Sequence, residues 1–213
     1  MNNDIALIWD LDGTLIDSYA VIVDGVYRVC KEYGIDVDIE KIKKEVILYS
    51  VSYYLNKIEI GKKAPFDEIK NRYSKITEEN NDKIIPMKNS LELLDKLKKL
   101  GVKNYVFTHR GLSTDFVLHN INMYGYFDEI ITSKSGFKRK PDPEGINYYV
   151  NKYHLDKNKT YYVGDRTLDM ECANNAGVKS ILYLPVGGIT PITGKETYVV
   201  KDLLEILDKL NIN

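Results

Sequence analysis

From Asn89 onward the chain alternates short apolar runs with segments of helical period. The apolar runs, each the length of one strand, span residues 102–108, 129–132, 161–163, 178–184 and 198–200. Leu91, Leu94 and Leu97 recur at helical spacing before Gly101, and a second helical segment, 167–176, ends at Gly177. This alternation predicts a parallel sheet with helices on both faces, a Rossmann-like three-layer α/β fold.

Residues 17–85 interrupt this pattern with helical period and no strand signal. The apolar positions that recur every three or four residues in this block are Ile22, Val26, Val29, Ile39, Ile42, Val46, Tyr53, Tyr54, Ile58, Phe66, Ile69, Tyr73 and Ile76. They predict four helices. We therefore expect a core formed by residues 1–16 and 86–213, with residues 17–85 inserted as a helical domain.

The first apolar run, residues 5–9, ends in two carboxylates, Asp10 and Asp12, followed by Gly13. Five apolar residues in a row are typical of a strand that is buried on both faces. Its carboxyl end lies at the sheet edge where open α/β folds bind ligands. Two acids held close together repel each other unless a cation or a shared proton relieves them. The alternative is an ordinary Asp-Gly turn in which Asp10 is a cap.

Four more polar residues lie at the ends of predicted strands or near the starts of predicted helices: Thr108, Lys140, Asp165 and Asp169. Because parallel strands end at the same edge of a sheet, these side chains can meet there. The set suits phosphoryl transfer, which requires positioning and neutralisation of phosphate oxygens. Hard carboxylate oxygens suit Mg²⁺.

Each residue taken alone also has a structural interpretation. Thr108 is an ordinary β-former, and Lys140 lies in a charged run that is typical of a solvated surface. Asp165 precedes a helix as an N-cap would, although Thr167 is better placed for that role. Asp169 near the helix start would complement the helix dipole.

Taken in order, the segments Asp10-x-Asp12-Gly13-Thr14, Thr108, Lys140 and Gly164-Asp165-x-x-x-Asp169 resemble the four motifs of the haloacid-dehalogenase-like hydrolases. The match is closest to the phosphoglycolate-phosphatase-like branch, in which a helical cap is inserted between the first and second motifs. The resemblance extends over essentially the whole chain, and residues 17–85 lie where that cap would be.

The resemblance implies a role for each matching residue. Asp10 would attack phosphorus and form an aspartyl-phosphate, and Asp12 would protonate the leaving oxygen and then deprotonate the hydrolytic water. Mg²⁺ would be bound by the Asp10 side chain, the Asp12 backbone carbonyl and Asp165. Thr108 and Lys140 would hold phosphoryl oxygens, and Asp169 would orient the metal shell or Lys140. The cap would close over a small phosphorylated metabolite.

His109 and Arg110 depart from the family pattern, in which Asn often follows the motif threonine. They are candidates for binding phosphate or a distal anionic group of the substrate, or alternatively they line the loop and pair with nearby acids. Three other functions remain open. They are a phosphosugar mutase, a phosphonate hydrolase using a cap lysine (Lys57, Lys62 or Lys63), and a catalytically silent binding module. A dehalogenase is disfavoured, because it would have no use for Asp12 or for Mg²⁺.

Charge and cysteine content limit which binding partners and which cellular location we expect for the protein. The chain of 213 residues carries 30 basic and 31 acidic side chains, a formal net charge of −1, so no overall field favours nucleic acid or an anionic membrane. We expect Cys30 and Cys172 to be buried and reduced. With no targeting or membrane-spanning segment expected, the predicted location is cytoplasmic. The sequence indicates no oligomeric state.

Overall fold

The computed structural model describes residues 4–58 and 63–212. The chain folds as two compact units: residues Met1–Asp17 with Pro86–Asn213, and residues Ser18–Ile85. The boundary expected from the sequence lies one residue earlier. No described helix has both the length and the apolar character needed to cross a bilayer. Cys30 and Cys172 are both buried and neither forms a disulfide.

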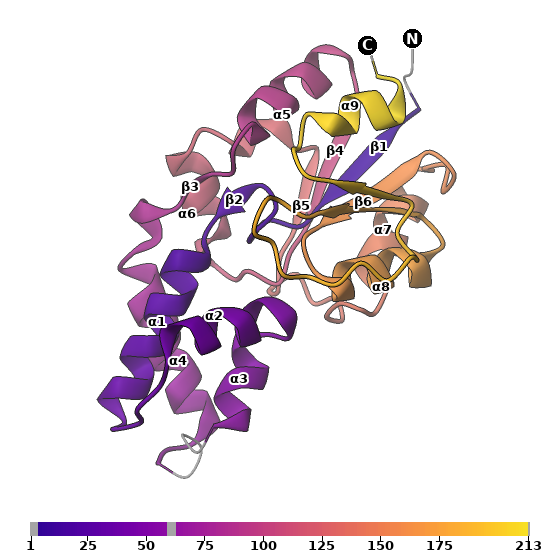
Figure 1. The fold of residues 1–213 in the computed structure, drawn as a ribbon. Helices are drawn as coiled ribbons and strands as arrows, with labels where there is room; N and C mark the ends of the chain where they lie inside the picture. The colour runs from indigo at the N-terminus through magenta and orange to yellow at the C-terminus, as the bar shows by residue number, and fades with distance from the viewer. Residues whose placement is uncertain (1–3, 59–62, 213) are drawn as a thin grey trace. The chain divides into compact units, whose positions relative to one another are not determined.

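The first unit contains a six-stranded sheet in the order β5-β4-β1-β6-β7-β8 (Figure 1). Every neighbouring pair is parallel, which confirms the predicted sheet. The strands are β1 (Ala6–Trp9), β4 (Lys103–Phe107), β5 (Glu129–Ile131), β6 (Thr160–Gly164), β7 (Lys179–Tyr183) and β8 (Tyr198–Val200). Two short strands, β2 (Ile16–Asp17) and β3 (Ile85–Pro86), form a separate pair.

Strand register brings the ends of β1, β4 and β6 to the same level. Trp9, the last residue of β1, is paired with Val106 on one side and Val163 on the other. Asp10 continues this arrangement, because its backbone N–H donates to the Val163 carbonyl at 2.9 Å. The segments that follow these three strands therefore begin at one edge of the sheet.

Helices cover both faces of this sheet, as the alternation predicted (Figure 1). They are α5 (Ser90–Lys99), α6 (Ser113–Asn120), α7 (Glu144–Lys152), α8 (Thr167–Ala176) and α9 (Glu205–Leu210), with a 3₁₀ turn, η3 (Tyr124–Tyr126). Helices α7 and α8 pack on the face that carries Ile8, Phe107 and Tyr162. Figure 1 shows α5 and α9 on the opposite side.

Two helix starts differ from the sequence prediction. Asp142-Pro143 predicts a helix with Pro143 as its first helical residue, but α7 begins at Glu144 with Pro143 as its N-cap. Helix α8 begins at Thr167 with Arg166 as its N-cap, so the expectation that Thr167 is the cap was wrong. The Asp169 carboxylate accepts the Arg166 backbone N–H at 3.1 Å and supplies the capping interaction from inside the helix.

The second unit contains the four predicted helices, α1 (Tyr19–Glu32), α2 (Ile39–Leu48), α3 (Val51–Lys57) and α4 (Phe66–Glu78), and a 3₁₀ turn, η2 (Asn81–Lys83). Their apolar faces form a core of their own. Side chains of Asp38 and Ser50 cap α2 and α3 by accepting backbone N–H groups. Gly25 in α1 allows close approach of α4, because a Cβ there would lie 2.6 Å from Thr77 Cγ2.

Candidate active site

A tight loop after β1 fixes the position of Asp10. The Leu11 carbonyl accepts the N–H groups of Thr14, Leu15 and Ile16, and this folds the chain back on itself. The turn places Gly13 at φ 83°, a conformation that glycine adopts without a steric penalty. Asp10, at the start of this loop, is only 1% exposed.

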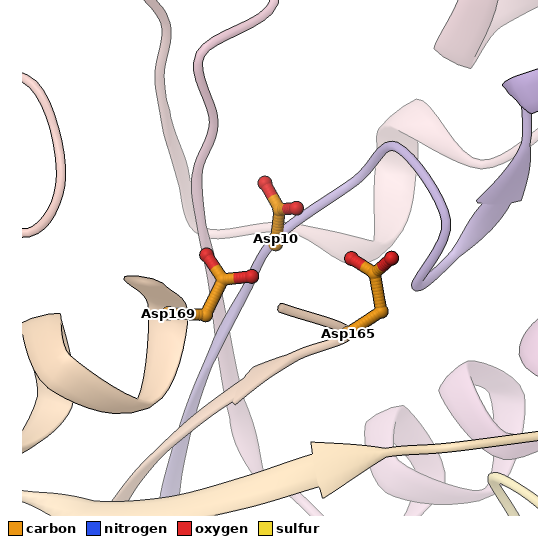
Figure 2. A group of neighbouring side chains, drawn as sticks. All are labelled: Asp10, Asp165 and Asp169. Carbon is orange, nitrogen blue, oxygen red and sulfur yellow. The ribbon is translucent and has the colours of Figure 1, made fainter. Parts of the chain in front are cut away.

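Three carboxylates converge beside this loop (Figure 2). Asp10 follows β1, Asp165 follows β6 and Asp169 lies in the first turn of α8. One oxygen of each carboxylate lies within 4.8 Å of the others, and all three residues are buried. Gly164 allows this approach, because a Cβ at that position would lie 2.4 Å from Asp169 Cβ.

The Lys140 side chain is fully buried, and its ammonium contacts this group of acids. Its ammonium donates to Asp10 Oδ1 at 2.8 Å, to Asp169 Oδ1 at 2.6 Å and to the Tyr162 hydroxyl at 2.9 Å. Burial alone lowers the pKa of Lys140, but Asp10 and Asp169 raise it above its usual value, so the group is charged. The alternative that Lys140 belongs to a solvated charged run was wrong.

The acids outnumber this one ammonium, and the surroundings of Asp10 suit a further cation. Asp10 Oδ2 is buried without a hydrogen-bond partner, and Arg166 Nη2 lies 3.8 Å from it. Burial raises the pKa of Asp10, although Lys140 opposes the rise. Oxygen ligands alone, with one of them unsatisfied, fit a hard divalent ion. Asp10 and Asp165 are the residues that would hold it.

Asp165 is itself held in place by two neighbouring threonines. Thr14 Oγ1 donates to Asp165 Oδ1 at 3.3 Å, and Thr190 Oγ1 donates to the Asp165 backbone carbonyl at 2.7 Å. Both threonines are buried. The carboxylate therefore has a defined position before any ligand binds.

Asp12 lies outside the three-carboxylate group and pairs with a different cation. Arg110 Nη1 donates to Asp12 Oδ1 at 2.7 Å, and the two side chains are 9% and 20% exposed. Thr108, the first residue after β4, is buried, and its Oγ1 accepts the Arg110 backbone N–H at 3.1 Å. The alternative that Arg110 pairs with a nearby acid thus describes the contact seen here.

His109 supports the Lys140 backbone. Its Nε2 accepts the Lys140 N–H at 2.7 Å, so the neutral ring carries its proton on Nδ1. Burial, followed by the charges of Lys140, Arg139 and Arg166, lowers the pKa of His109 to about 2. The imidazole is therefore uncharged at neutral pH, and any contact that it makes with an anion is through a neutral N–H.

The low pKa of His109 gives the protein a specific pH dependence of stability. Below about pH 6.5 the unfolded chain binds a proton at His109, while the folded chain does not until about pH 2. The free energy of unfolding therefore falls as the pH falls through this window, by up to about 1.4 kcal/mol per pH unit from this residue. His109→Gln, which keeps an acceptor, should flatten the slope measured by urea denaturation between pH 6.5 and 4.5. The same change at the exposed His119 is the control, and equal slopes for the two variants would contradict the prediction.

Sequence reasoning missed two members of the site. Tyr162 was interpreted only as an apolar strand residue, and nothing in its spacing separates it from the other buried tyrosines. The sequence could have indicated Arg166 as a site residue, because it directly follows Asp165 within the fourth motif. Its guanidinium lies 3.8 Å from Asp10 and 3.9 Å from Asp169.

Comparisons with known proteins identify relatives of this chain. The family model of the haloacid dehalogenase-like hydrolases matches residues 7–183, a span that includes Asp10, Lys140 and Asp165. The chain belongs to the haloacid dehalogenase-like hydrolases. This hydrolase is 26% identical over 207 residues to the pyrophosphatase PpaX of Bacillus velezensis, with 95% of this chain and 94% of the relative covered. It is 27% identical to a phosphoglycolate phosphatase of Aquifex aeolicus, with 84% of each chain covered.

A solved structure extends the comparison to the fold. A HAD-superfamily hydrolase of subfamily IA from Geobacter sulfurreducens matches with a TM-score of 0.76, 25% identity and 98% coverage of both chains. The relatives carry phosphatase and pyrophosphatase names, so this hydrolase lies among family members that act on phosphorylated compounds.

Proposed function

We propose that this hydrolase is a Mg²⁺-dependent phosphatase that acts on a small phosphorylated metabolite through an aspartyl-phosphate on Asp10. The observation that carries the proposal is the environment of Asp10. One oxygen is held by the Lys140 ammonium, and the other is unsatisfied at the sheet edge beside Asp165. A carboxylate nucleophile divides one difficult displacement into two easier ones.

The chain's own groups then have separate tasks. Lys140 fixes the direction of Asp10 Oδ1 and lowers the repulsion between Asp10 and an incoming anion. Asp12, outside the carboxylate group, protonates the leaving oxygen and later takes a proton from water. Thr108 and Arg166 would donate to phosphoryl oxygens, and Asp169 holds Lys140. The bound Mg²⁺ would supply positive charge to the phosphoryl oxygens.

Metal dependence has an expected outcome that can be measured without turnover. Mg²⁺ added to chelator-treated protein should raise the thermal midpoint, since a ligand at about 100 times its Kd stabilises the folded state by about 2.7 kcal/mol. Asp165→Asn should abolish that shift. Asp12→Asn is the matched control, because the Asp12 side chain is not a proposed ligand. It should keep the Mg²⁺ shift while losing turnover of an aryl phosphate. Full turnover in the presence of chelator would overturn the metal assignment.

The ion pair between Arg110 and Asp12 bears on the substrate class. The Arg110 guanidinium lies next to Asp12, the proposed acid, where the leaving group would lie. The named substrates of the two relatives, pyrophosphate and phosphoglycolate, both carry a second anionic group near the transferred phosphoryl. We therefore propose a substrate of that kind, contacted by Arg110. A turnover screen of phosphorylated metabolites with and without a second anionic group tests this.

Two alternatives within the family are distinguished by product analysis. A phosphosugar mutase would transfer the phosphoryl group to a sugar hydroxyl and release little inorganic phosphate. A phosphonate hydrolase would need a lysine that forms a Schiff base, and borohydride would trap it. Lys57 is engaged with Glu45 at 2.8 Å, Lys63 is exposed, and Lys62 lies outside the described residues.

A further inference from the structure

The hydroxyl of Tyr162 lies where three parts of the site meet. Tyr162 is on β6 and fully buried. Its oxygen lies 2.9 Å from Lys140 Nζ and 2.7 Å from the backbone carbonyl oxygen of Phe107, the last residue of β4. The residue after Phe107 is Thr108. One hydroxyl therefore links the catalytic ammonium to the ends of two strands.

The direction of both hydrogen bonds follows from their partners. A backbone carbonyl only accepts, so the Tyr162 O–H donates to Phe107. The ammonium only donates, so the same oxygen accepts from Lys140. Burial raises the pKa of Tyr162 well above its usual value, which keeps the phenol neutral and able to donate.

Tyr162 also completes the hydrogen bonding of Lys140. An ammonium has three N–H groups, and those of Lys140 point to Asp10, Asp169 and Tyr162. The two carboxylates attract the ammonium electrostatically. Tyr162 provides a neutral third contact, and its own hydroxyl is held by the Phe107 backbone carbonyl. Without it, the ammonium is free to turn about the two acids, and the orientation of Asp10 Oδ1 changes with it.

We propose that Tyr162 is a positioning residue that holds the Lys140 ammonium, and through it Asp10, in the orientation required for attack on phosphorus. The proposal rests on the proposed function for the catalytic part and on the hydrogen-bond geometry for the positioning part. A misplacement of about 1 Å at a reacting group costs about a hundredfold in rate, so a loss of orientation should reduce kcat.

The kinetic test compares two tyrosines. In Tyr162→Phe we expect kcat for an aryl phosphate to fall at least about tenfold with little change in KM, since the effect is on orientation of the nucleophile. Tyr149→Phe is the matched control. Tyr149 is also fully buried, and its hydroxyl donates to the carbonyl of Val106, the neighbouring residue on β4, at 2.6 Å, but it does not touch Lys140. A general loss of packing or stability would affect both variants. Equal kcat values for the two would overturn the proposal.

A second measurement tests the positioning without any turnover. In ¹⁵N-labelled protein the buried Lys140 ammonium should give a side-chain signal protected from exchange with water, assigned by its absence in Lys140→Arg. We expect faster exchange of this signal in Tyr162→Phe and unchanged exchange in Tyr149→Phe. If the wild-type chain hydrolyses no phosphate ester, the proposed function fails and this measurement alone decides the positioning role. Unchanged exchange in Tyr162→Phe would refute it.

Discussion

Asp10→Asn should lower the turnover of a generic aryl phosphate by roughly a thousandfold or more. The amide keeps the size of the carboxylate but is not a nucleophile, so the covalent intermediate cannot form. The position is specific: Asp10 is the carboxylate that Lys140 contacts on one oxygen and that has no hydrogen-bond partner on the other. Initial rates with saturating Mg²⁺ measure the effect.

Two controls separate loss of chemistry from loss of fold. Urea denaturation of Asp10→Asn should show a cooperative transition, and Asp4→Asn, which changes an exposed carboxylate that pairs with Lys159, should keep wild-type turnover. Acid quenching of the wild-type enzyme during turnover should yield a phosphorylated peptide containing Asp10, which is absent from the variant. Turnover that survives in Asp10→Asn would refute the nucleophile assignment.

Lys140→Met should lower the free energy of unfolding by about 3–5 kcal/mol. Methionine approximates the length of the lysine side chain but brings no charge. Its introduction leaves Asp10 and Asp169, whose side chains are 1% and 0% exposed, facing each other without the ammonium between them. Uncompensated buried charge is among the most destabilising changes that a single substitution causes. Equilibrium urea denaturation without added metal measures the loss.

The loss should depend on pH in a defined direction. In the variant, at least one buried carboxyl has a folded-state pKa above its unfolded value of about 4, so the folded state binds the extra proton. The loss of unfolding free energy in Lys140→Met is therefore smallest at acid pH, and it grows as the pH rises from about 4 through the raised folded-state pKa. The double change Lys140→Met with Asp169→Asn removes one of the two acids and should recover part of the loss.

A surface ion pair provides the comparison for Lys140. Lys152 contacts Glu129 at 2.9 Å, but its side chain is 45% exposed. Lys152→Met should cost about 1 kcal/mol or less, because water replaces the lost partner. If Lys140→Met cost no more than Lys152→Met, the buried ammonium would not be the group that holds these acids together.

Much of the fold could be predicted because it depends on local patterns. Apolar runs of strand length and glycines at helix ends identified the sheet and its flanking helices, and the helix 167–176 was predicted with the bounds that the structure shows. Helix caps were predicted less well, because Arg166 and Thr167 are adjacent and the capping carboxylate comes from Asp169. A cap depends on where a side chain points, which spacing alone does not reveal.

The sequence by itself determined which chemical groups reach the edge of the sheet. Asp10 and Asp165 each follow an apolar run and Thr108 ends one, and parallel strands bring such positions together whatever the details of packing. Only the tertiary structure decided which of these groups are partners. The Lys140 ammonium contacts residues 130, 29 and 22 positions away, and one of them, Tyr162, has the same pattern as an ordinary core tyrosine. Hydrogen bonds depend on angles and distances of a few tenths of an ångström, and these are set when the strands and helix α8 pack.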